Sequence, residues 1–386
     1  MGNVGTYRRS LGLVELVSLG VGGTIGSGIF VVPGVAAQLS GPASLAAWVI
    51  VAVSASCVLL SLAYVAYRFT ATDSFYSLFE SIFGTRIAVV LILLYLVSAV
   101  FGIATIAAGI GQYLSFFGIS TGLIIEASII AIFCGINIAG VSLSGKTENV
   151  LTLIKIVPLV LIALLLLPYI RAENFISQAP VTAAGILATV IIVYWPFTGF
   201  EISAIPVEET KDPLIIRRSL LIVMVTVVAI YLLLNIALIG SIGSAALAAS
   251  PAPVAAAAAI LFPYSGTIVA FIGIVAMLSA INAYILATSR IIHRIATRFS
   301  IAGIRDLSRT GTPASAIVAG CGISAALLLI SNDFAYLATV AVIATLIPYI
   351  FFCFASWILV PNIRARCISG IGAASTAAIL IIYFVV

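Results

Sequence analysis

The sequence predicts an all-α polytopic membrane protein, and two observations carry this prediction. Of the 386 residues, 63% are hydrophobic and only 8% are charged, whereas soluble domains carry roughly 25% charged residues. The apolar residues also fall into runs of about 20, which is the length of helix that crosses a bilayer. The lipid bilayer is therefore an expected partner of this chain.

Charge and cysteine patterns argue against several other classes of protein. The net charge of +5 is typical of basic cytoplasmic loops in a membrane protein, so nucleic acid is not an expected partner. The five cysteines are scattered and there is a single histidine, His293, which argues against a metal site or a haem. We expect no cofactor. We also expect no enzyme, because no titratable groups cluster at one depth.

Eleven apolar segments are expected to form the membrane helices. They cover residues 11–32, 43–67, 87–111, 121–140, 149–170, 182–206, 217–241, 264–293, 313–331, 335–360 and 367–386. If the N-terminus is cytoplasmic, all of the 17 Lys and Arg residues except Arg171 fall in inner segments. Basic residues concentrate on the cytoplasmic side of membrane proteins. We therefore expect a protein of the cytoplasmic (plasma) membrane with its N-terminus inside.

The first segment contains the run GVGGTIGSGIF at residues 20–30. Because glycine costs about 1 kcal/mol at a helical position, this helix is expected to break. Such a break is tolerated only where it is buried in protein or lines a wet cavity, and free amides at a helix start attract anions. The amides of Gly26, Ser27 and Gly28 and the hydroxyls of Thr24 and Ser27 would then hold a carboxylate. The alternative is a seam of small residues that lets helices pack closely.

The sixth segment contains a second interruption, YWPFTGFE at residues 194–201, and Pro206 lies further on. Proline removes a backbone donor and Gly199 allows unwinding. Carbonyl groups freed at Phe197, Thr198 and Phe200 would suit an ammonium group, so that the two breaks together bind the zwitterionic end of an α-amino acid. A simple proline kink is the alternative.

Each break lies in the first helix of a set of five. Broken helices at matching positions of two inverted halves indicate the central site of a secondary transporter. The expected organisation is one transmembrane domain with a first repeat at 1–170, a second at 171–360 and an additional helix at 361–386. A channel is a rival interpretation, but the polar residues do not form a continuous file through the protein.

Three motifs, in this order, resemble those of the amino acid–polyamine–organocation permeases: GTIGSGIF at 23–30, TLIKIVPL at 152–159 and FTGFE at 197–201. The resemblance covers the first ten helices and implies a LeuT-type fold and transport by alternating access. It further implies that the carbonyl of Ile25 helps to hold the ammonium group and that Trp195 lies at an outer gate. A lysine at the position of Lys155 fills the place where sodium-coupled relatives bind a cation.

Lys155 bears on coupling, because it lies about six residues into the fifth helix, or ~9 Å along its axis. Its side chain could extend to the cytoplasmic surface. Alternatively it is a buried amine that takes and releases a proton, which predicts proton-coupled and sodium-independent transport. Ser279 and Asn282 share one face of the eighth helix. They are expected to contact Lys155 or the ligand, or else to form hydrogen bonds between helices.

The remaining candidates concern gating and the substrate. Trp195, Phe197 and Phe200 could form a lid, although aromatic residues in membrane helices often serve packing. Glu201 is expected to bind unwound backbone or to act in gating, and Glu15 to pair with a loop arginine. Glu201 is the one acid in the middle of helices 1, 3, 6, 8 and 10, so a neutral amino acid fits better than arginine or a polyamine. Symport, exchange of amino acids or amines, and the oligomeric state stay open.

Overall fold

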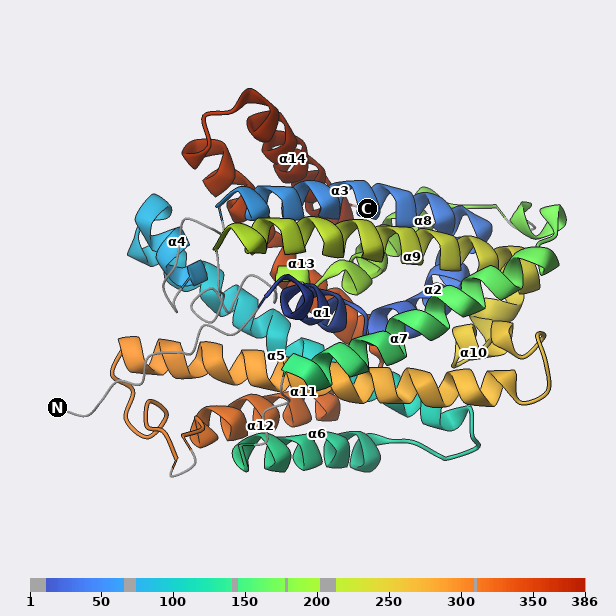
Figure 1. Cartoon of the computed structure of the whole chain (residues 1–386), viewed down its shortest axis with the longest axis horizontal. Coiled ribbons are helices and arrows are strands. Elements are labelled where there is room, and N and C mark those ends of the chain that lie inside the picture. Colours follow the sequence, from blue (N-terminus) through green and yellow to red (C-terminus); the bar gives the residue numbers. More distant parts are fainter. Residues whose placement is uncertain are drawn as a thin grey trace.

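The structure is a computed structural model that describes residues 12–65, 74–140, 145–177, 180–201, 213–308 and 311–385. In these ranges every regular element is a helix, as predicted. The long helices run side by side along the longest axis of the molecule (Figure 1). Among the described residues, seven helical stretches are long and apolar enough to cross a membrane, and three shorter apolar helices accompany them.

Helices in the first half of the chain include both pieces of the first predicted segment. They are α1 (Leu13–Thr24), α2 (Ser27–Ser40), η1 (Gly41–Ala43), α3 (Ser44–Val65), α4 (Ser74–Phe83), α5 (Thr85–Ser115), α6 (Leu123–Ile138) and α7 (Gly145–Leu166).

Helices in the second half include the short turns that connect and interrupt the longer ones. They are η3 (Leu167–Tyr169), η4 (Ala172–Phe175), α8 (Ala183–Tyr194), η5 (Trp195–Phe197), α9 (Pro213–Ala249), α10 (Pro253–Ala258), α11 (Ser265–Arg298), α12 (Ala314–Ile330), α13 (Phe334–Leu359) and α14 (Ile363–Val385).

Each of the eleven predicted segments contains helix, while the number of membrane crossings stays a prediction. The helices α4 and α10 were not predicted, because at ten and six residues they are far shorter than a membrane span. Several helices are longer than the apolar windows suggested; α2, for example, continues to Ser40. The end of the segment predicted at 182–206, including Pro206, lies outside the described residues.

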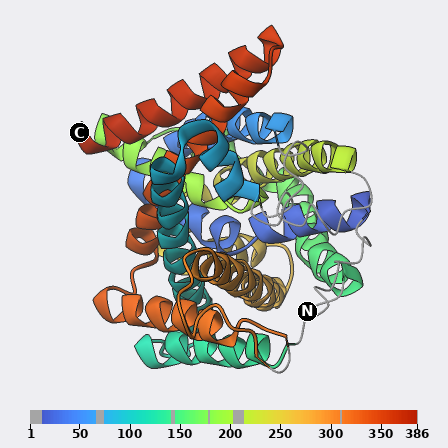
Figure 2. The same ribbon diagram turned by 90° about the vertical axis from the view of Figure 1, so that its left-hand side faces the viewer.

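The first broken helix occupies the middle of the molecule. α1 contacts α7, α9 and α11, and α2 contacts α5, α8, α9, α10 and α11. The view along the bundle shows the same arrangement, with α1 surrounded by other helices (Figure 2). From Ser27 to Gly34 every residue of α2 is buried, so the break in this helix lies inside protein and away from lipid.

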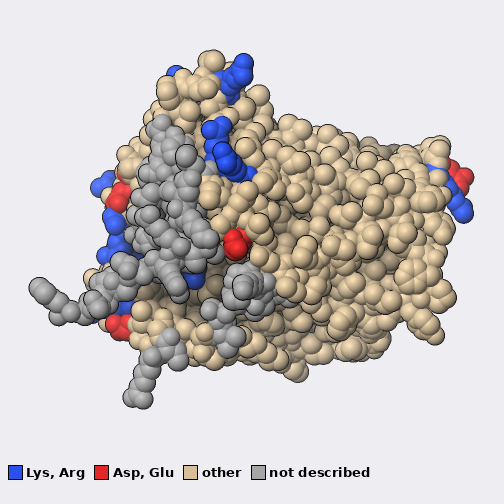
Figure 3. All heavy atoms as spheres, viewed as in Figure 1, with Lys and Arg blue, Asp and Glu red and all other residues tan. Residues whose placement is uncertain are grey.

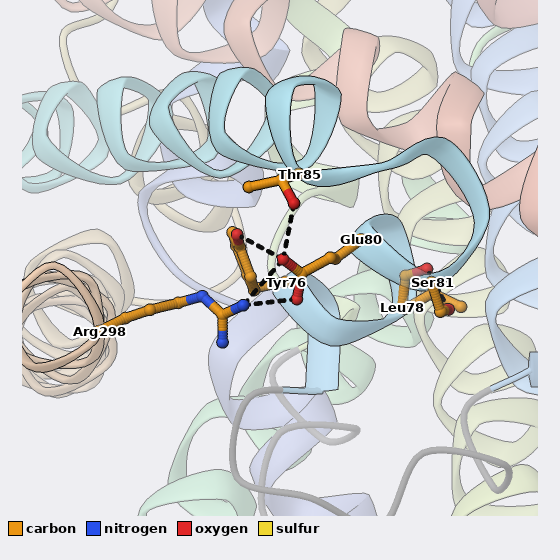
Figure 4. A network of polar contacts seen from close by, with 6 residues as sticks. All are labelled: Tyr76, Leu78, Glu80, Ser81, Thr85 and Arg298. Atoms are coloured by element: carbon orange, nitrogen blue, oxygen red, sulfur yellow. Dashed lines mark hydrogen bonds and ion pairs between the residues drawn. The ribbon is translucent and has the colours of Figure 1, made fainter.

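On the face drawn in Figure 3, charged side chains lie mainly in the half of the molecule that holds α4 and at the opposite end, and the wide region between them is free of charge. At one end α4 is tied to α11: Arg298 Nη2 donates to Glu80 Oε1 and Oε2 at 2.8 and 2.6 Å (Figure 4). The hydroxyls of Tyr76 and Thr85 donate to Glu80 Oε1 at 3.1 and 3.0 Å. At the other end Arg171 and Glu173 form an exposed ion pair.

Candidate functional site

The first break lies between α1 and α2, where the sequence predicted it. Ile25 (φ −81°, ψ 94°) and Gly26 (φ −140°, ψ −142°) leave the helical conformation. Both neighbours, Thr24 and Ser27, are buried. The first amides of α2 have no acceptor within the helix, and the last carbonyls of α1 largely lack a donor there. The break therefore places free backbone groups of both kinds in the interior.

The second break follows α8. The chain passes from the α-helix at Tyr194 into the 3₁₀ turn of η5, and Thr198 is extended (φ −79°, ψ 158°). Gly199 has φ +93°, a conformation that glycine adopts without the steric cost of a side chain. The helix thus unwinds through Gly199, which is more than the kink that Pro196 alone would cause.

The two breaks touch each other. Trp195 Nε1 donates to Ser27 Oγ at 3.2 Å. A Cβ atom added to Gly28 would lie 2.5 Å from Pro196 Cα, and one added to Gly199 would lie 2.8 Å from the Gly23 carbonyl oxygen. The glycines therefore serve close packing as well as unwinding, while the carboxylate site stays a prediction.

Tyr231 of α9 bridges the breaks and was missed in the sequence. Its buried hydroxyl lies 3.0 Å from the Thr24 carbonyl oxygen and 3.0 Å from the Pro196 carbonyl oxygen. One carbonyl belongs to each break, so this single donor keeps the two in register. A tyrosine in an apolar helix carries no signal of this role, because the carbonyl groups that it reaches are distant in sequence.

Two hydroxyls predicted to hold a carboxylate are already engaged by protein groups. Thr24 Oγ1 donates to the Gly20 carbonyl at 2.6 Å, and Ser27 Oγ accepts from Trp195. Thr198 Oγ1 donates to the Trp195 carbonyl at 2.8 Å. A carboxylate would have to compete for the protons of Thr24 and Thr198, which are donated to protein carbonyl groups, whereas Ser27 Oγ accepts from Trp195 and can still donate its own proton.

Lys155 is buried in α7, with 1% of its surface exposed. Nζ donates to the Gly22 carbonyl of α1 at 3.0 Å, and one turn earlier Thr152 Oγ1 donates to the Ser18 carbonyl at 3.0 Å. The alternative in which Lys155 extends to the surface is therefore wrong. The physical reason is that the broken end of α1 offers carbonyl groups that lack helical donors.

The candidates on α11 have different surroundings. Asn282 Oδ1 accepts from Asn137 Nδ2 of α6 at 2.8 Å, as in the interhelical alternative. The buried Ser279 hydroxyl has no hydrogen-bond partner among the residues that the structure describes. Their expected contact with Lys155 or a ligand stays a prediction.

Glu201 is buried and binds the unwound backbone, as predicted. Oε2 accepts from the Gly199 amide at 3.1 Å and from the Tyr349 hydroxyl at 2.8 Å, and Oε1 accepts from the Tyr95 hydroxyl at 2.7 Å. The two tyrosines, from α13 and α5, were not predicted. Three donors converge on this carboxylate, which satisfies a charged group at a depth where it would otherwise be costly.

Glu15 lies at the start of α1, where Oε2 accepts from the Gly12 amide at 2.9 Å. A carboxylate at this position supplies an acceptor to the exposed start of the helix. In the described ranges its contact is therefore local. Arg8 and Arg9, two of the loop arginines, lie outside those ranges, so the predicted ion pair stays a prediction.

The three aromatic residues of the second break are packed against neighbours. The ring of Trp195 lies 6.0 Å from that of Tyr284, Phe197 lies 5.1 Å from Tyr231, and Phe200 lies 5.3 Å from Tyr349. A small cavity of about 20 Å³ also touches Phe197 and Phe200, which is room for about one water molecule. These contacts hold the aromatic residues in place beside the breaks.

Comparison with known proteins agrees with the motifs. A family model for amino acid permeases matches residues 11–386. The chain is 23% identical to the branched-chain amino acid permease BcaP of Bacillus subtilis over 54% of its own length and 49% of that protein's. It is 26% identical to the inner membrane transport protein YbaT of Escherichia coli, over 73% and 68% of the two chains.

A further relative is the chloroplastic cationic amino acid transporter 9 of Arabidopsis thaliana, at 28% identity over 53% of this chain and 40% of the relative. The matched region thus spans about half the length of several of these relatives. The family match itself runs through nearly all of the sequence and includes both breaks and Lys155. The chain belongs to the amino acid permease family.

Proposed function

We propose that this protein carries a neutral amino acid across the cytoplasmic membrane by alternating access, coupled to protons and independent of sodium. The observation that carries the proposal is the contact between two unwound helix segments in the interior. Each segment interrupts the first helix of a set of five, which supports a LeuT-type arrangement with repeats at 1–170 and 171–360. Membership of the amino acid permease family supports the same class of cargo.

The substrate backbone would bind to both breaks. The carboxylate lies at the start of α2, where the amides of Gly26, Ser27 and Gly28 and the helix dipole favour an anion. The ammonium group lies against the carbonyl groups released at Ile25 and at residues 197, 198 and 200. In the described conformation, hydrogen bonds from Tyr231 and Trp195 link the two half-sites.

Glu201 supports a neutral side chain on the substrate. Both of its oxygens accept hydrogen bonds from protein donors, at Tyr95, Tyr349 and Gly199. Because these three donors already fill most of the acceptor sites of the carboxylate, Glu201 has little capacity left for a cationic side chain. Among the relatives, the name of BcaP specifies branched-chain substrates and that of transporter 9 specifies cationic ones, so the substrate test must include both kinds.

Lys155 supports proton coupling. The Nζ atom binds the Gly22 carbonyl near the end of α1, where the negative end of the helix dipole favours a cation. Loss of the proton weakens this contact and releases α1, while the charged amine holds it. While it is protonated, the amine also supplies the positive charge that a sodium ion would otherwise provide at this position, which supports transport in sodium-free medium.

Orientation in the membrane follows from the charge distribution. The end of the molecule that holds Glu80 and Arg298 carries most of the basic side chains visible in Figure 3. In our proposal this end faces the cytoplasm. Glu15 would then act in gating on the inner side and Trp195, with Glu201 behind it, on the outer side.

Counterflow into proteoliposomes tests the proposal. Vesicles loaded with one unlabelled amino acid are expected to accumulate a labelled neutral amino acid, with saturation and without sodium, and arginine is expected to compete poorly. Flux that does not saturate would favour a pore. Uptake of arginine in preference to every neutral amino acid would contradict the assigned side-chain class.

A further inference from the structure

A row of buried and half-buried hydroxyl groups joins α14 to α3. Ser54 and Ser61 are seven residues apart and therefore share one face of α3. Ser54 Oγ lies 2.8 Å from Ser375 Oγ and 3.4 Å from Thr376 Oγ1, and Ser61 Oγ donates to Ser369 Oγ at 3.0 Å. The pairing shows that the two helices are antiparallel and are held together at two levels.

The first of the two levels, which we call the Tyr194 cluster, consists of Ser54, Tyr194, Ser375 and Thr376. The Tyr194 hydroxyl lies 2.6 Å from Ser54 Oγ and 3.4 Å from Thr376 Oγ1. Tyr194 is fully buried and is the last residue of α8. The very next residue, Trp195, begins the second break and donates to Ser27 of the first. The cluster thus holds the C-terminal end of α8, and the residue that follows this end connects the second break to the first.

The second level, which we call the Ser369 cluster, consists of Ser61, Ser356 and Ser369. Ser369 Oγ donates to Ser356 Oγ of α13 at 2.9 Å. This cluster joins the same two helices, α3 and α14, with the same kind of hydrogen bond. Within the described residues, none of the hydrogen bonds of this cluster involves a residue of either break, so it provides a matched control for packing alone.

We infer that the Tyr194 cluster positions the second break, so that α14, a helix outside the two repeats, helps to shape the substrate site. Phenylalanine would fill nearly the same volume as Tyr194, so the contribution of the hydroxyl is to fix the orientation of the end of α8. Bonds to α3 and α14 fix the rotation of the end of α8, and that rotation sets where Trp195 and the carbonyl groups of 197–200 point. The inference rests on the proposed function, because these carbonyl groups are its ammonium site.

The test compares variants of the two clusters in the full-length protein, reconstituted in proteoliposomes. Tyr194→Phe and Thr376→Val remove hydroxyls from the Tyr194 cluster, and Ser61→Ala and Ser369→Ala remove them from the Ser369 cluster. We expect the first pair to raise the KM of counterflow about three- to tenfold, the factor that one interhelical hydrogen bond in a membrane is worth. The maximal rate should change less than KM, Thr376→Ser should restore KM, and the second pair should leave it unchanged.

Amide hydrogen exchange gives a second readout that does not depend on transport. Exchange in a peptide covering 195–201 should be faster in Tyr194→Phe and unchanged in Ser61→Ala. Equal effects from both clusters, or no effect from either, would overturn the inference, since both then serve packing only. If the wild-type protein showed no counterflow of any amino acid, the proposed function would be contradicted instead. The difference in amide hydrogen exchange between Tyr194→Phe and Ser61→Ala would still decide the role of the cluster.

Discussion

The two helix breaks are satisfied in different ways. At the first break, side chains from other helices reach the freed carbonyl groups: Lys155 of α7 binds Gly22 and Tyr231 of α9 binds Thr24. At the second break, residues of the break itself do much of this work. Glu201 accepts from the Gly199 amide and Thr198 donates to the Trp195 carbonyl.

This difference indicates which break is the more easily moved. The geometry of the first depends on two distant side chains, one of which is the proposed proton carrier, whereas the second carries part of its own support. A change of protonation at Lys155 would therefore act on α1 before it acts on the segment after α8. The first break is the better candidate for the moving part of the transport cycle, and the second for the fixed part.

The largest expected effect comes from Lys155→Ala. It leaves the Gly22 carbonyl buried without its donor, at a cost of about 1–3 kcal/mol, and removes the proposed proton carrier. We expect uptake to fall at least tenfold and to lose its dependence on pH. Uptake measured across a pH series checks this, with Lys155→Arg as a variant that keeps the charge. An unchanged pH profile would exclude Lys155 from coupling.

Tyr231→Phe is expected to have the next largest effect, because one hydroxyl serves both breaks. The Thr24 and Pro196 carbonyl groups would both lose the hydroxyl that they share, at a cost of about 1–3 kcal/mol. The KM of counterflow should rise and the melting temperature should fall. Tyr336→Phe, which alters a tyrosine that is 49% exposed, is the control, and equal behaviour of the two variants would count against the bridge.

Glu201→Gln tests whether the second break, as well as the first, contributes to proton coupling. An amide keeps one acceptor oxygen but turns the other acceptor into a donor that faces the hydroxyl of Tyr95 or of Tyr349. Because hydrogen bonds to a charged group are worth about 1.5–3 kcal/mol, the melting temperature should fall, while the pH profile of uptake should keep its shape. A profile that flattens as in Lys155→Ala would show that the second break, and not the first, carries the coupling.

Glu80→Gln is expected to have the smallest effect, far from both breaks. Partial desolvation opposes the shift, but hydrogen bonds from Thr85 and Tyr76 and the charge of Arg298 lower the pKa of Glu80 below its ordinary value of 4.5. A lowered folded-state pKa stabilises the protein above the unfolded value and loses this effect as the pH falls through the folded value. The variant should melt slightly below wild type at neutral pH, and the difference should vanish well below pH 4.5. A constant difference would show that the Glu80 charge is not responsible.

Hydropathy and two local irregularities were enough to predict the membrane class and the places where the first and sixth helices unwind. Both are properties of short stretches: glycine at 26 and 199 and proline at 196 act on their own backbone, whatever surrounds them. The burial of Lys155 was only one of two alternatives, because the stem of a lysine permits either position.

Only the tertiary structure decided which groups satisfy the opened backbone. Tyr231, Tyr95 and Tyr349 come from helices that are apolar nearly all round, so their sequences do not specify which face meets which neighbour. Glu80 and Arg298, which bind each other, are 218 residues apart in the sequence. Depth and rotation of packed helices set these contacts. A linear sequence determines where the backbone opens, whereas the packing of the other helices determines what closes around it.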